Sequence, residues 1–311
     1  MQTMNLFLPH PERIPIYSSC WVGPFLEFLQ PVCFDRRNRM LEIRRVTTFD
    51  EPDLGPYRTM RRHHEHRVKR IFVAEGVKVV TRLLESDLEV VSVLLPDEWF
   101  EHFRPMLEKR PEPVIRVWLA EKKLVEQLTG FSMFQGVLAV GRIPPEPVLE
   151  ELVDRSPQPR LFVALDGLTN AENVGAILRC CGAFRVHGVL SGENSSSPYL
   201  RRAVRSSMGA VFEIPVIESE SLVRDLQRLR AKGVRIIAAH PRKEAKKISE
   251  ADFRRDICLV LGSEGYGITE PVLEVCDEWV AIPMPEGFDS LNVSHAGVVF
   301  LYEIARQRGL M

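Results

Sequence analysis

The chain has 311 residues, 45% of them hydrophobic and 27% charged, a balance that excludes a largely disordered protein. Its formal net charge of -1 means that an anionic partner must be met by a local basic patch. There is no run of about 18 apolar residues to indicate a membrane span, and no secretory signal pattern opens the chain.

The first part of the chain differs from the rest. Residues 1–39 carry scattered prolines and aromatic residues without a sustained period. They are either a true N-terminal arm or an over-extended start, and we favour Met40 as the native first residue. We therefore expect residues 1–39 to be non-native or disordered, within an N-terminal extension of residues 1–56.

Residues 57–143 show the pattern of a small α/β domain. The strand "RIFVAEG" leads into the helix "EGVKVVTRLLES", which places Val77, Val80, Leu83 and Leu84 on one face. The strands "EVVSVLLP" and "PVIRVWLA", the helix "EKKLVEQLTG" and the strand "GVLAVG" follow. The proline-rich stretch of residues 144–160 is typical of a linker that includes one short helical turn.

Residues 161–311 alternate strands with helices, which predicts a largely parallel α/β sheet. The expected strands are "LFVALDG", "HGVLSG", "FEIPVI", "VRIIAAH", "ICLVLGSEG" and "WVAIPM". Ligands gather at the carboxyl ends of strands in such sheets, so residues that follow these strands are candidates for a site.

The first candidate is the helix "NVGAILRCCGAFRVHG". Apolar side chains recur on one face over residues 174–184, and Arg179 falls on the other side. Gly175 and Gly182 each cost about 1 kcal/mol relative to alanine in a helix, so another element should approach closely there. A capped helix with a solvated arginine accounts for this spacing, and a ligand site facing Asn173 is the alternative.

The second candidate is "LVLGSEGYGITEPVLEVC". A strand ends in Gly262, Gly265 and Gly267, and glycines allow backbone amides to approach a ligand. The stretch lacks the G-K-[ST] sequence of a P-loop. Glu264 disfavours phosphate and suits a cationic or hydroxyl-bearing ligand, whereas a solvated turn glutamate is the plain alternative.

The third candidate is "GFDSLNVSHAGVVFLYEIARQRG". Ser290, Asn292 and Ser294 alternate, as in a half-exposed extended segment, directly before an apolar helix from about Val293 to Arg306. Polar groups entering a buried region need hydrogen-bond partners, which a ligand pocket would supply. Burial of the helix on more than one side indicates a partner subunit or an unusual threading of the chain.

Together these stretches resemble the SpoU (TrmH) family of RNA ribose methyltransferases, within the SPOUT superfamily. "NVGAILR" is similar to its first motif, "LVLGSEGYGI" with "VAIPM" to its second, and "SLNVSHAGVVFLYEI" to its third. "SPYLRRAVRSSMGAVFEIP" resembles the stretch between the first two motifs. "FVAEGVKVV" and "FQGVLAV" resemble the small substrate-binding domain, of ribosomal-protein type, that precedes the catalytic domain in many members.

The resemblance implies a SPOUT-type parallel sheet with a C-terminal trefoil knot, an exception to the rule that chains do not thread loops. A smaller α/β RNA-binding domain would precede it, and the catalytic domain would form a homodimer. The implied reaction transfers a methyl group from S-adenosylmethionine to a ribose 2′-hydroxyl in structured RNA. The preceding domain favours ribosomal RNA over transfer RNA.

The resemblance also assigns residues. Arg179 would be catalytic, with Asn173, Ser290 and Asn292 around the target ribose. Because free arginine titrates above about 12, we favour Arg179 as a clamp on phosphate and on developing negative charge rather than as a base. His295 departs from the family pattern and is interpreted as a packed or capping residue. The implied cofactor contacts are Gly262, Glu264, Gly265, Ile282, Leu291 and Ser294.

Basic residues gather in two stretches that suit contact with RNA phosphates. A solvated helix face is the alternative for the first stretch. The second lies where the family turns toward its substrate. The predicted RNA contacts are Arg58, Arg61, Arg62, Arg67, Arg201, Arg202, Arg205 and Ser207.

The cysteines argue against a metal site. Six cysteines without a C-x-x-C pair argue against a zinc site and a disulfide framework and for a reducing cytoplasm, so we expect no metal. A transfer RNA methyltransferase and a non-catalytic RNA-binding or ribosome-assembly factor on the same fold remain open. An ordinary nucleotide-dependent enzyme is disfavoured, because "DGLTNAENVG" lacks the required glycine order.

Overall fold

The computed structural model describes residues 33–34, 40–60, 62–129, 136–242, 244–287 and 290–310. The expectation for residues 1–39 therefore falls almost entirely outside the described residues. Among the described helices, none combines the length and the apolar character that a bilayer crossing needs.

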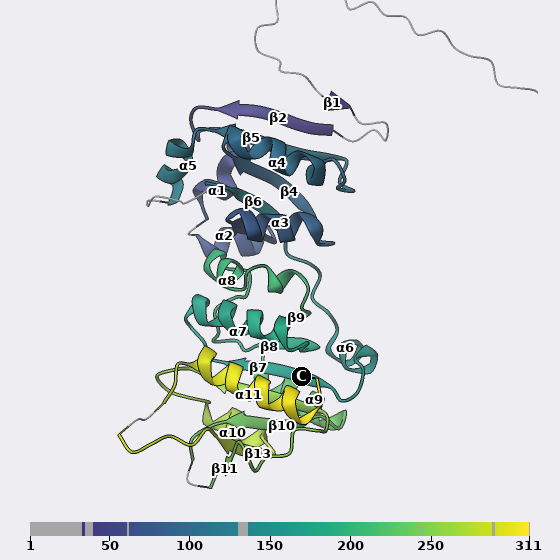
Figure 1. Cartoon of the computed structure of the whole chain (residues 1–311), viewed down its shortest axis with the longest axis vertical. Coiled ribbons are helices and arrows are strands. Elements are labelled where there is room, and N and C mark those ends of the chain that lie inside the picture. Colours follow the sequence, from purple (N-terminus) through teal and green to yellow (C-terminus); the bar gives the residue numbers. More distant parts are fainter. Residues whose placement is uncertain are drawn as a thin grey trace, which may run out of the picture. The chain divides into compact units, whose positions relative to one another are not determined.

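The described N-terminal half is built on a mixed sheet with the strand order β1-β2-β5-β4-β6-β3 (Figure 1). Strands β2, β5 and β4 run parallel, and the other pairings are antiparallel. The strands are β1 (Cys33–Phe34), β2 (Met40–Val46), β3 (Ile71–Glu75), β4 (Val90–Leu95), β5 (Val114–Ala120) and β6 (Leu138–Arg142). The helices are α1 (Gly55–Arg58), α2 (His63–Val68), α3 (Val77–Glu85), α4 (Asp97–Leu107) and α5 (Lys122–Thr129), with a 3-10 turn at Pro52–Leu54.

The structure differs from the expected N-terminal extension and from the expected linker in how these segments pack. Strand β2 pairs with β5 along its whole length, so Met40–Val46 belongs to the sheet and not to an extension. The expected linker contains helix α6 (Leu149–Arg155), whose buried Leu149, Leu152 and Val153 pack in the core of the second sheet. Both segments are held by distant partners, which the local composition does not reveal.

The C-terminal half is a parallel sheet with the order β11-β13-β10-β12-β7-β8-β9, as expected for residues 161–311. The strands are β7 (Leu161–Asp166), β8 (Gly188–Ser191), β9 (Val216–Glu218), β10 (Arg235–Ala239), β11 (Lys246–Lys247), β12 (Ile257–Gly262) and β13 (Glu278–Ala281). The helices are α7 (Ala171–Ala183), α8 (Arg201–Ser206), α9 (Leu222–Ala231), α10 (Glu270–Val275) and α11 (Val293–Gln307), with a 3-10 turn at Ala210–Phe212.

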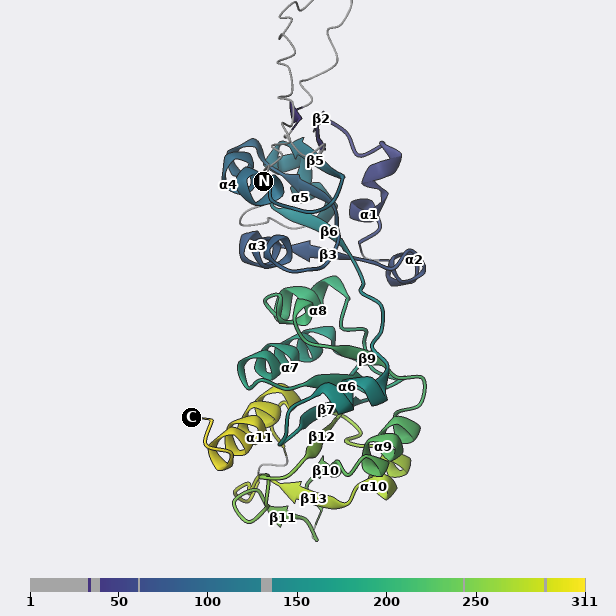
Figure 2. The ribbon, with the colours of Figure 1, turned by 90° about the vertical axis from the view of Figure 1, so that its right-hand side faces the viewer.

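Helices cover both faces of this sheet (Figure 2). Strand β7 shows why, since all of its residues are buried and successive side chains point to opposite faces. Leu161, Val163 and Leu165 join the core with α7 and α11, whereas Phe162 and Ala164 join the core with α6, α9 and α10. This is the α/β architecture of a parallel sheet buried on both sides. The trefoil knot that the resemblance implies stays a prediction.

Strand β3 contacts α8 and the turn that follows it. The Phe72 ring stacks on Phe212 with centroids 5.3 Å apart and lies 5.8 Å from the Tyr199 ring. The buried Glu75 carboxylate accepts hydrogen bonds from Arg201 and, at 3.1 Å, from Arg205. We call this set the β3 contact.

Arg308, directly after α11, ties the end of that helix to the start of β7. Its guanidinium donates to the carbonyl oxygens of Pro159 at 2.8 Å and Arg160 at 3.0 Å, just before β7. It also donates to Phe253 at 2.9 Å and Arg255 at 2.6 Å, just before β12. One side chain thus joins α11 to the entries of two adjacent strands.

Candidate active site

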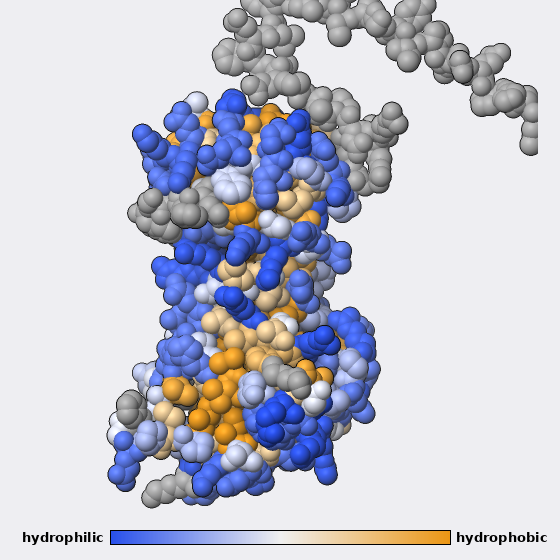
Figure 3. Space-filling model, in the orientation of Figure 1, coloured by the Kyte–Doolittle hydropathy of each residue, from blue (hydrophilic) through white to orange (hydrophobic). Residues whose placement is uncertain are grey.

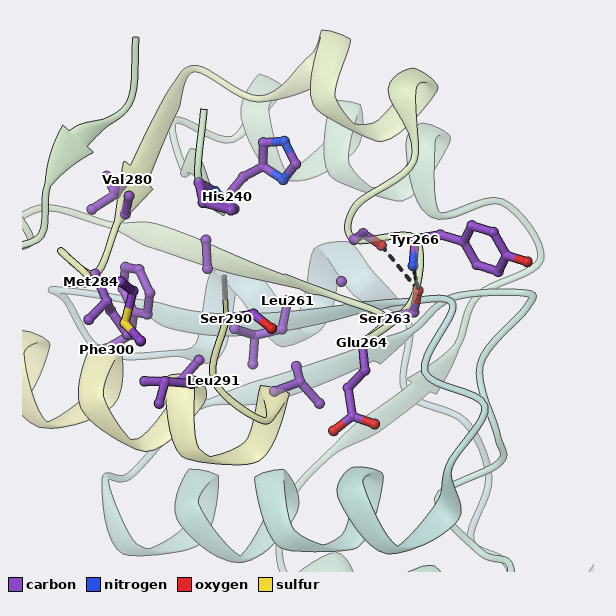
Figure 4. A pocket seen from close by; sticks show the side chains of 18 of the residues that line it. His240, Leu261, Ser263, Glu264, Tyr266, Val280, Met284, Ser290, Leu291 and Phe300 are labelled. Atoms are coloured by element: carbon purple, nitrogen blue, oxygen red, sulfur yellow. Dashed lines mark hydrogen bonds between the residues drawn. The ribbon is translucent and has the colours of Figure 1, made fainter. Parts of the chain in front are cut away.

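A pocket of about 340 Å³ opens at the carboxyl ends of β10, β12 and β13 (Figure 4). This is where open parallel sheets bind ligands, and the volume lies in the range of small-molecule sites. We call it the strand-end pocket. Its lining is Ala239, His240, Pro241, Leu261, Gly262, Ser263, Glu264, Gly265, Tyr266, Gly267, Val280, Ala281, Ile282, Met284, Ser290, Leu291, Val293, Ala296 and Phe300.

The glycine-rich turn after β12 forms one wall of the pocket. Ser263 and Gly267 exchange backbone hydrogen bonds of 2.9 and 3.0 Å, which closes a tight turn. A side chain at Gly262 would overlap the backbone of Gly267 and Ile268, and Gly267 has a φ of +70°. Glycine is therefore required at both positions by close backbone approach and by a left-handed conformation.

Four polar side chains meet beside the pocket. The Nδ2 group of Asn292 donates to Asn173 Oδ1 at 3.2 Å and to the Glu264 carboxylate. Its Oδ1 atom accepts from the backbone N–H of Ser294 at 2.9 Å and from the Ser294 hydroxyl at 2.6 Å. We call Asn173, Glu264, Asn292 and Ser294 the polar junction. It joins residues from all three sequence motifs, and the Asn292 amide has a fixed orientation.

The local structure differs from the expected alternation of polar residues. Asn292 is the N-cap of α11, and Ser294 lies in the first turn of that helix rather than in an extended segment. An N-cap asparagine satisfies backbone N–H groups that the helix leaves open. His295 is exposed on α11, so its interpretation as a packed or capping residue is wrong.

Most predicted cofactor contacts lie at the pocket. Gly262, Glu264, Gly265, Ile282 and Leu291 line it, together with the predicted ribose contact Ser290. Ser294 is absent from the lining and acts in the polar junction. Arg179 is exposed on α7 and is also absent from the lining. It follows Asn173 by six residues, which places it about 9 Å further along the helix and on another side.

The predicted RNA contacts separate into two groups. Arg58, Arg62, Arg67 and Arg202 are exposed, although Arg62 also pairs with Glu65 at 3.1 Å. Arg61 lies outside the described residues. These exposed cations keep the charge that phosphate contact requires.

Two predictions in the second basic stretch are wrong, and a third is qualified. Ser207 is fully buried, where its hydroxyl donates to Val204 O at 2.8 Å and cannot reach RNA. The Arg201 side chain is 10% exposed and pairs with Glu75. Arg205 is 57% exposed yet also pairs with Glu75. A basic run looks the same in sequence whether it faces solvent or a distant buried carboxylate.

Several pocket-lining residues were not predicted from the sequence. His240, Tyr266, Met284 and Phe300 line the pocket, and burial together with the charge of Arg242 lowers the pKa of His240. His240 and Met284 follow β10 and β13, so the carboxyl-end rule was a signal that identified their region. Among the described residues, no group of three or more His, Cys, Asp or Glu side chains is placed to hold a metal.

Comparison with known proteins identifies the family of the chain. The model of the SpoU rRNA Methylase family matches residues 160–302. An uncharacterised tRNA/rRNA methyltransferase of Mycobacterium bovis is 32% identical over 86% of this chain and 93% of its own length. The 23S rRNA (guanosine-2′-O-)-methyltransferase RlmB of Ralstonia nicotianae is 34% identical over 63% of this chain and 79% of its own length.

Solved structures share the fold. The crystal structure of an RNA 2′-O ribose methyltransferase has a TM-score of 0.71 at 25% identity and covers 86% of this chain and 100% of that chain. The AdoMet-bound rRNA methyltransferase of Sinorhizobium meliloti has a TM-score of 0.73 at 24% identity, covering 85% and 98%. The chain therefore belongs to the SpoU rRNA methylase family and is an RNA methyltransferase.

Proposed function

We propose that this chain transfers a methyl group from S-adenosylmethionine to a ribose 2′-hydroxyl of structured RNA, with ribosomal RNA as the preferred substrate. The observation that carries the proposal is the polar junction, which unites three separate motifs beside the strand-end pocket. The named relatives support the RNA class, because one acts on the 2′-O position of 23S rRNA.

The pocket fits S-adenosylmethionine in its chemistry. Leu261, Val280 and Phe300 offer apolar surface for the adenine ring, and the turn after β12 offers backbone donors and acceptors. The exposed Glu264 carboxylate supplies negative charge for a cationic ligand. When bound, the cofactor supplies an electrophilic methyl group on a positively charged sulfur.

The protein's task is then to align the ribose hydroxyl with that methyl group. Because Asn292 uses both atoms of its amide in hydrogen bonds, the edge formed with Asn173 cannot rotate. A fixed polar edge orients a hydroxyl without reorganisation, which is how positioning accelerates a reaction. Ser290, exposed at the pocket, adds a hydroxyl that we assign to the ribose.

Arg179 is assigned to the phosphate of the target nucleotide and to developing negative charge. Its exposure on α7 suits a phosphate, which lies several ångströms from the 2′-hydroxyl of the same nucleotide. Arg179→Ala is expected to abolish methyl transfer and to leave cofactor affinity unchanged by calorimetry. Arg179→Lys should recover part of the rate, since it keeps the charge without the planar fork. A collapse of cofactor affinity in Arg179→Ala would contradict the assignment.

A homodimer is part of the proposal. Leu291, Val299 and Tyr302 are 40%, 38% and 51% exposed, and apolar surface gathers where α11 lies (Figure 3). Such a patch is typical of an interface. Sedimentation at micromolar concentration is expected to give a dimer, and Val299→Glu should give monomers. A wild-type monomer at all concentrations would refute this part.

The function is tested by mapping 2′-O-methyl groups in total RNA from cells with and without the gene. Loss of one mark in ribosomal RNA, restored by the wild-type gene but not by Arg179→Ala, is the expected result. Loss of a mark in transfer RNA would keep the reaction and change the substrate. No lost mark in either RNA would contradict the proposal.

A further inference from the structure

Tyr266 stands at the rim of the strand-end pocket with its side chain in solvent. The residue is 95% exposed, the highest value among the exposed large hydrophobic residues of the described chain. Figure 4 shows its ring leaving the turn in a different direction from Glu264, and pointing out of the pocket rather than into it. The ring therefore lies outside the proposed cofactor volume, on the same turn as Glu264 of the polar junction.

The backbone that carries Tyr266 is held in a hydrogen-bonded turn. Its own N–H donates to Ser263 Oγ at 3.1 Å, and Ser263 and Gly267 close the turn around it. The turn is also anchored below, where Thr269 N–H donates to the buried Asp166 at 2.7 Å. The His240 ring lies against Gly267, within 3.6 Å of where a Cβ atom would stand.

An exposed aromatic ring carried on a hydrogen-bonded turn has a chemical use at this place. Unpaired bases of RNA stack on exposed aromatic side chains, and such stacking contributes about 1–3 kcal/mol per base. Tyr266 and Glu264 are two residues apart, so their Cα atoms are separated by at most about 7 Å. That span is comparable to one nucleotide step, so a base stacked on the ring would belong to a neighbour of a nucleotide held at the junction.

We propose that Tyr266 is a stacking platform for a nucleobase adjacent to the methylated ribose. This inference rests on the proposed function, because it assumes that RNA enters at the polar junction. Stacking on the ring would not discriminate among the four bases, since every base presents a π surface. It holds the target strand unstacked while the neighbouring ribose reaches the pocket.

The test uses the full-length protein and two fluorescent single-stranded probes of about 12 nucleotides, the scale of single-strand sites. One is an adenosine RNA, and the other is an abasic chain with the same phosphates. Tyr266→Ala should bind the adenosine probe at least about fivefold more weakly, the low end of stacking energies. It should bind the abasic probe like the wild type.

Matched variants separate stacking from other roles. Tyr266→Phe keeps the ring and should behave like the wild type, whereas Arg67→Gln should weaken both probes equally, because it removes a phosphate contact. Calorimetry should give the wild-type affinity for S-adenosylmethionine in Tyr266→Ala. Equal losses on both probes, no preference for the base-bearing probe in the wild type, or a weakened cofactor affinity would each overturn the platform.

Failure of the platform is distinguishable from failure of the proposed function. If wild-type protein methylates ribosomal RNA from cells lacking the gene, and Tyr266→Ala does so with unchanged kcat/KM, only the platform is wrong. If the wild type transfers no methyl group to that RNA, the proposed function is wrong whatever the probes show.

Discussion

At the scale of single residues, Asn292 has two separable tasks. As an N-cap it accepts from Ser294 N–H, and as a donor it holds Asn173 and Glu264. Asn292→Asp keeps the oxygen that caps the helix. It replaces the Nδ2 donor with a second carboxylate oxygen, which would face the acceptor oxygens of Asn173 and Glu264. We expect stability within about 1 kcal/mol of the wild type, and methyl transfer reduced at least about 100-fold by misplacement of the junction.

The matched control is another helix cap. Asn170 caps α7 by accepting from Glu172 N–H at 2.8 Å, and Asn170→Asp makes the same chemical change away from the junction. The turnover of both variants is measured by transfer of a tritiated methyl group from S-adenosylmethionine to RNA, and that of Asn170→Asp should equal the wild type. Equal losses in both variants would show that the junction has no special role.

We expect His187 to make the stability of the chain depend on pH. Its Nδ1 atom accepts the Leu161 N–H at 3.0 Å, and burial, followed by the charge of Arg308, lowers its pKa. The folded state thus binds fewer protons than the unfolded state, whose histidine titrates near about 6.5. The contribution of neutral His187 to the free energy of unfolding is fully present above that pH. It is lost as the pH falls below it, because the unfolded chain then binds a proton that the folded chain does not.

Urea unfolding at pH 7.5 and pH 5.5 measures this loss. His187→Gln keeps an acceptor that does not titrate, so the difference in midpoint between the two pH values should shrink in the variant. An unchanged difference would assign the pH dependence to other groups, such as His240, whose pKa burial also lowers.

At the scale of elements, two glycines of α7 provide a paired test. A side chain at Gly175 would overlap Ala203 O and lie 2.6 Å from Ser206 Cβ, whereas one at Gly182 would meet Ala210 Cβ at 3.3 Å. Both alanine variants gain about 1 kcal/mol in helix propensity. We expect Gly175→Ala to be destabilised by about 1–3 kcal/mol in urea, because α8 cannot move aside, and Gly182→Ala to stay near the wild type. Equal stabilities would contradict the close packing of α7 on α8.

Sequence periodicity predicted the elements that rest on local pattern. The close approach expected at the α7 glycines is confirmed at Gly175, and the strands of the parallel sheet lie near the expected segments. Helix α4 was not predicted, although Trp99, Phe103 and Leu107 recur at helical spacing, because Pro105 lies inside it. Strand β2 was missed because its apolar partner β5 lies far along the chain and its own sequence is half charged.

The candidate site was predictable to a similar extent. The motifs identified the members of the polar junction, since each carries a polar residue at a strand or helix end. The burial of Arg201 in the second basic stretch was not predictable, because its partner Glu75 is 126 residues away. Long-range pairing of a buried carboxylate leaves no signal in local composition.

At the scale of the whole molecule, the β3 contact is expected to contribute strongly to stability. Glu75→Gln would leave Arg201, which is 10% exposed, without a carboxylate partner. Breaking a buried pair by removing one partner costs about 3–5 kcal/mol. Glu89→Gln is the control, because it removes an ion pair with Arg142 that is about half exposed (49% and 54%) and worth about 0–1 kcal/mol. Similar urea midpoints for the two variants would show that the β3 contact is weak.

The position of α11 in the chain has a consequence for biosynthesis. The helix follows every strand of the parallel sheet, yet its cap Asn292 organises the polar junction and Arg308 ties the entries of β7 and β12 together. During translation the sheet can therefore assemble before the site exists. A nascent chain halted before residue 292 would contain all seven described strands of that sheet but would lack the polar junction. If the junction serves the reaction as proposed, we expect methyl transfer only after the last described helix has left the ribosome.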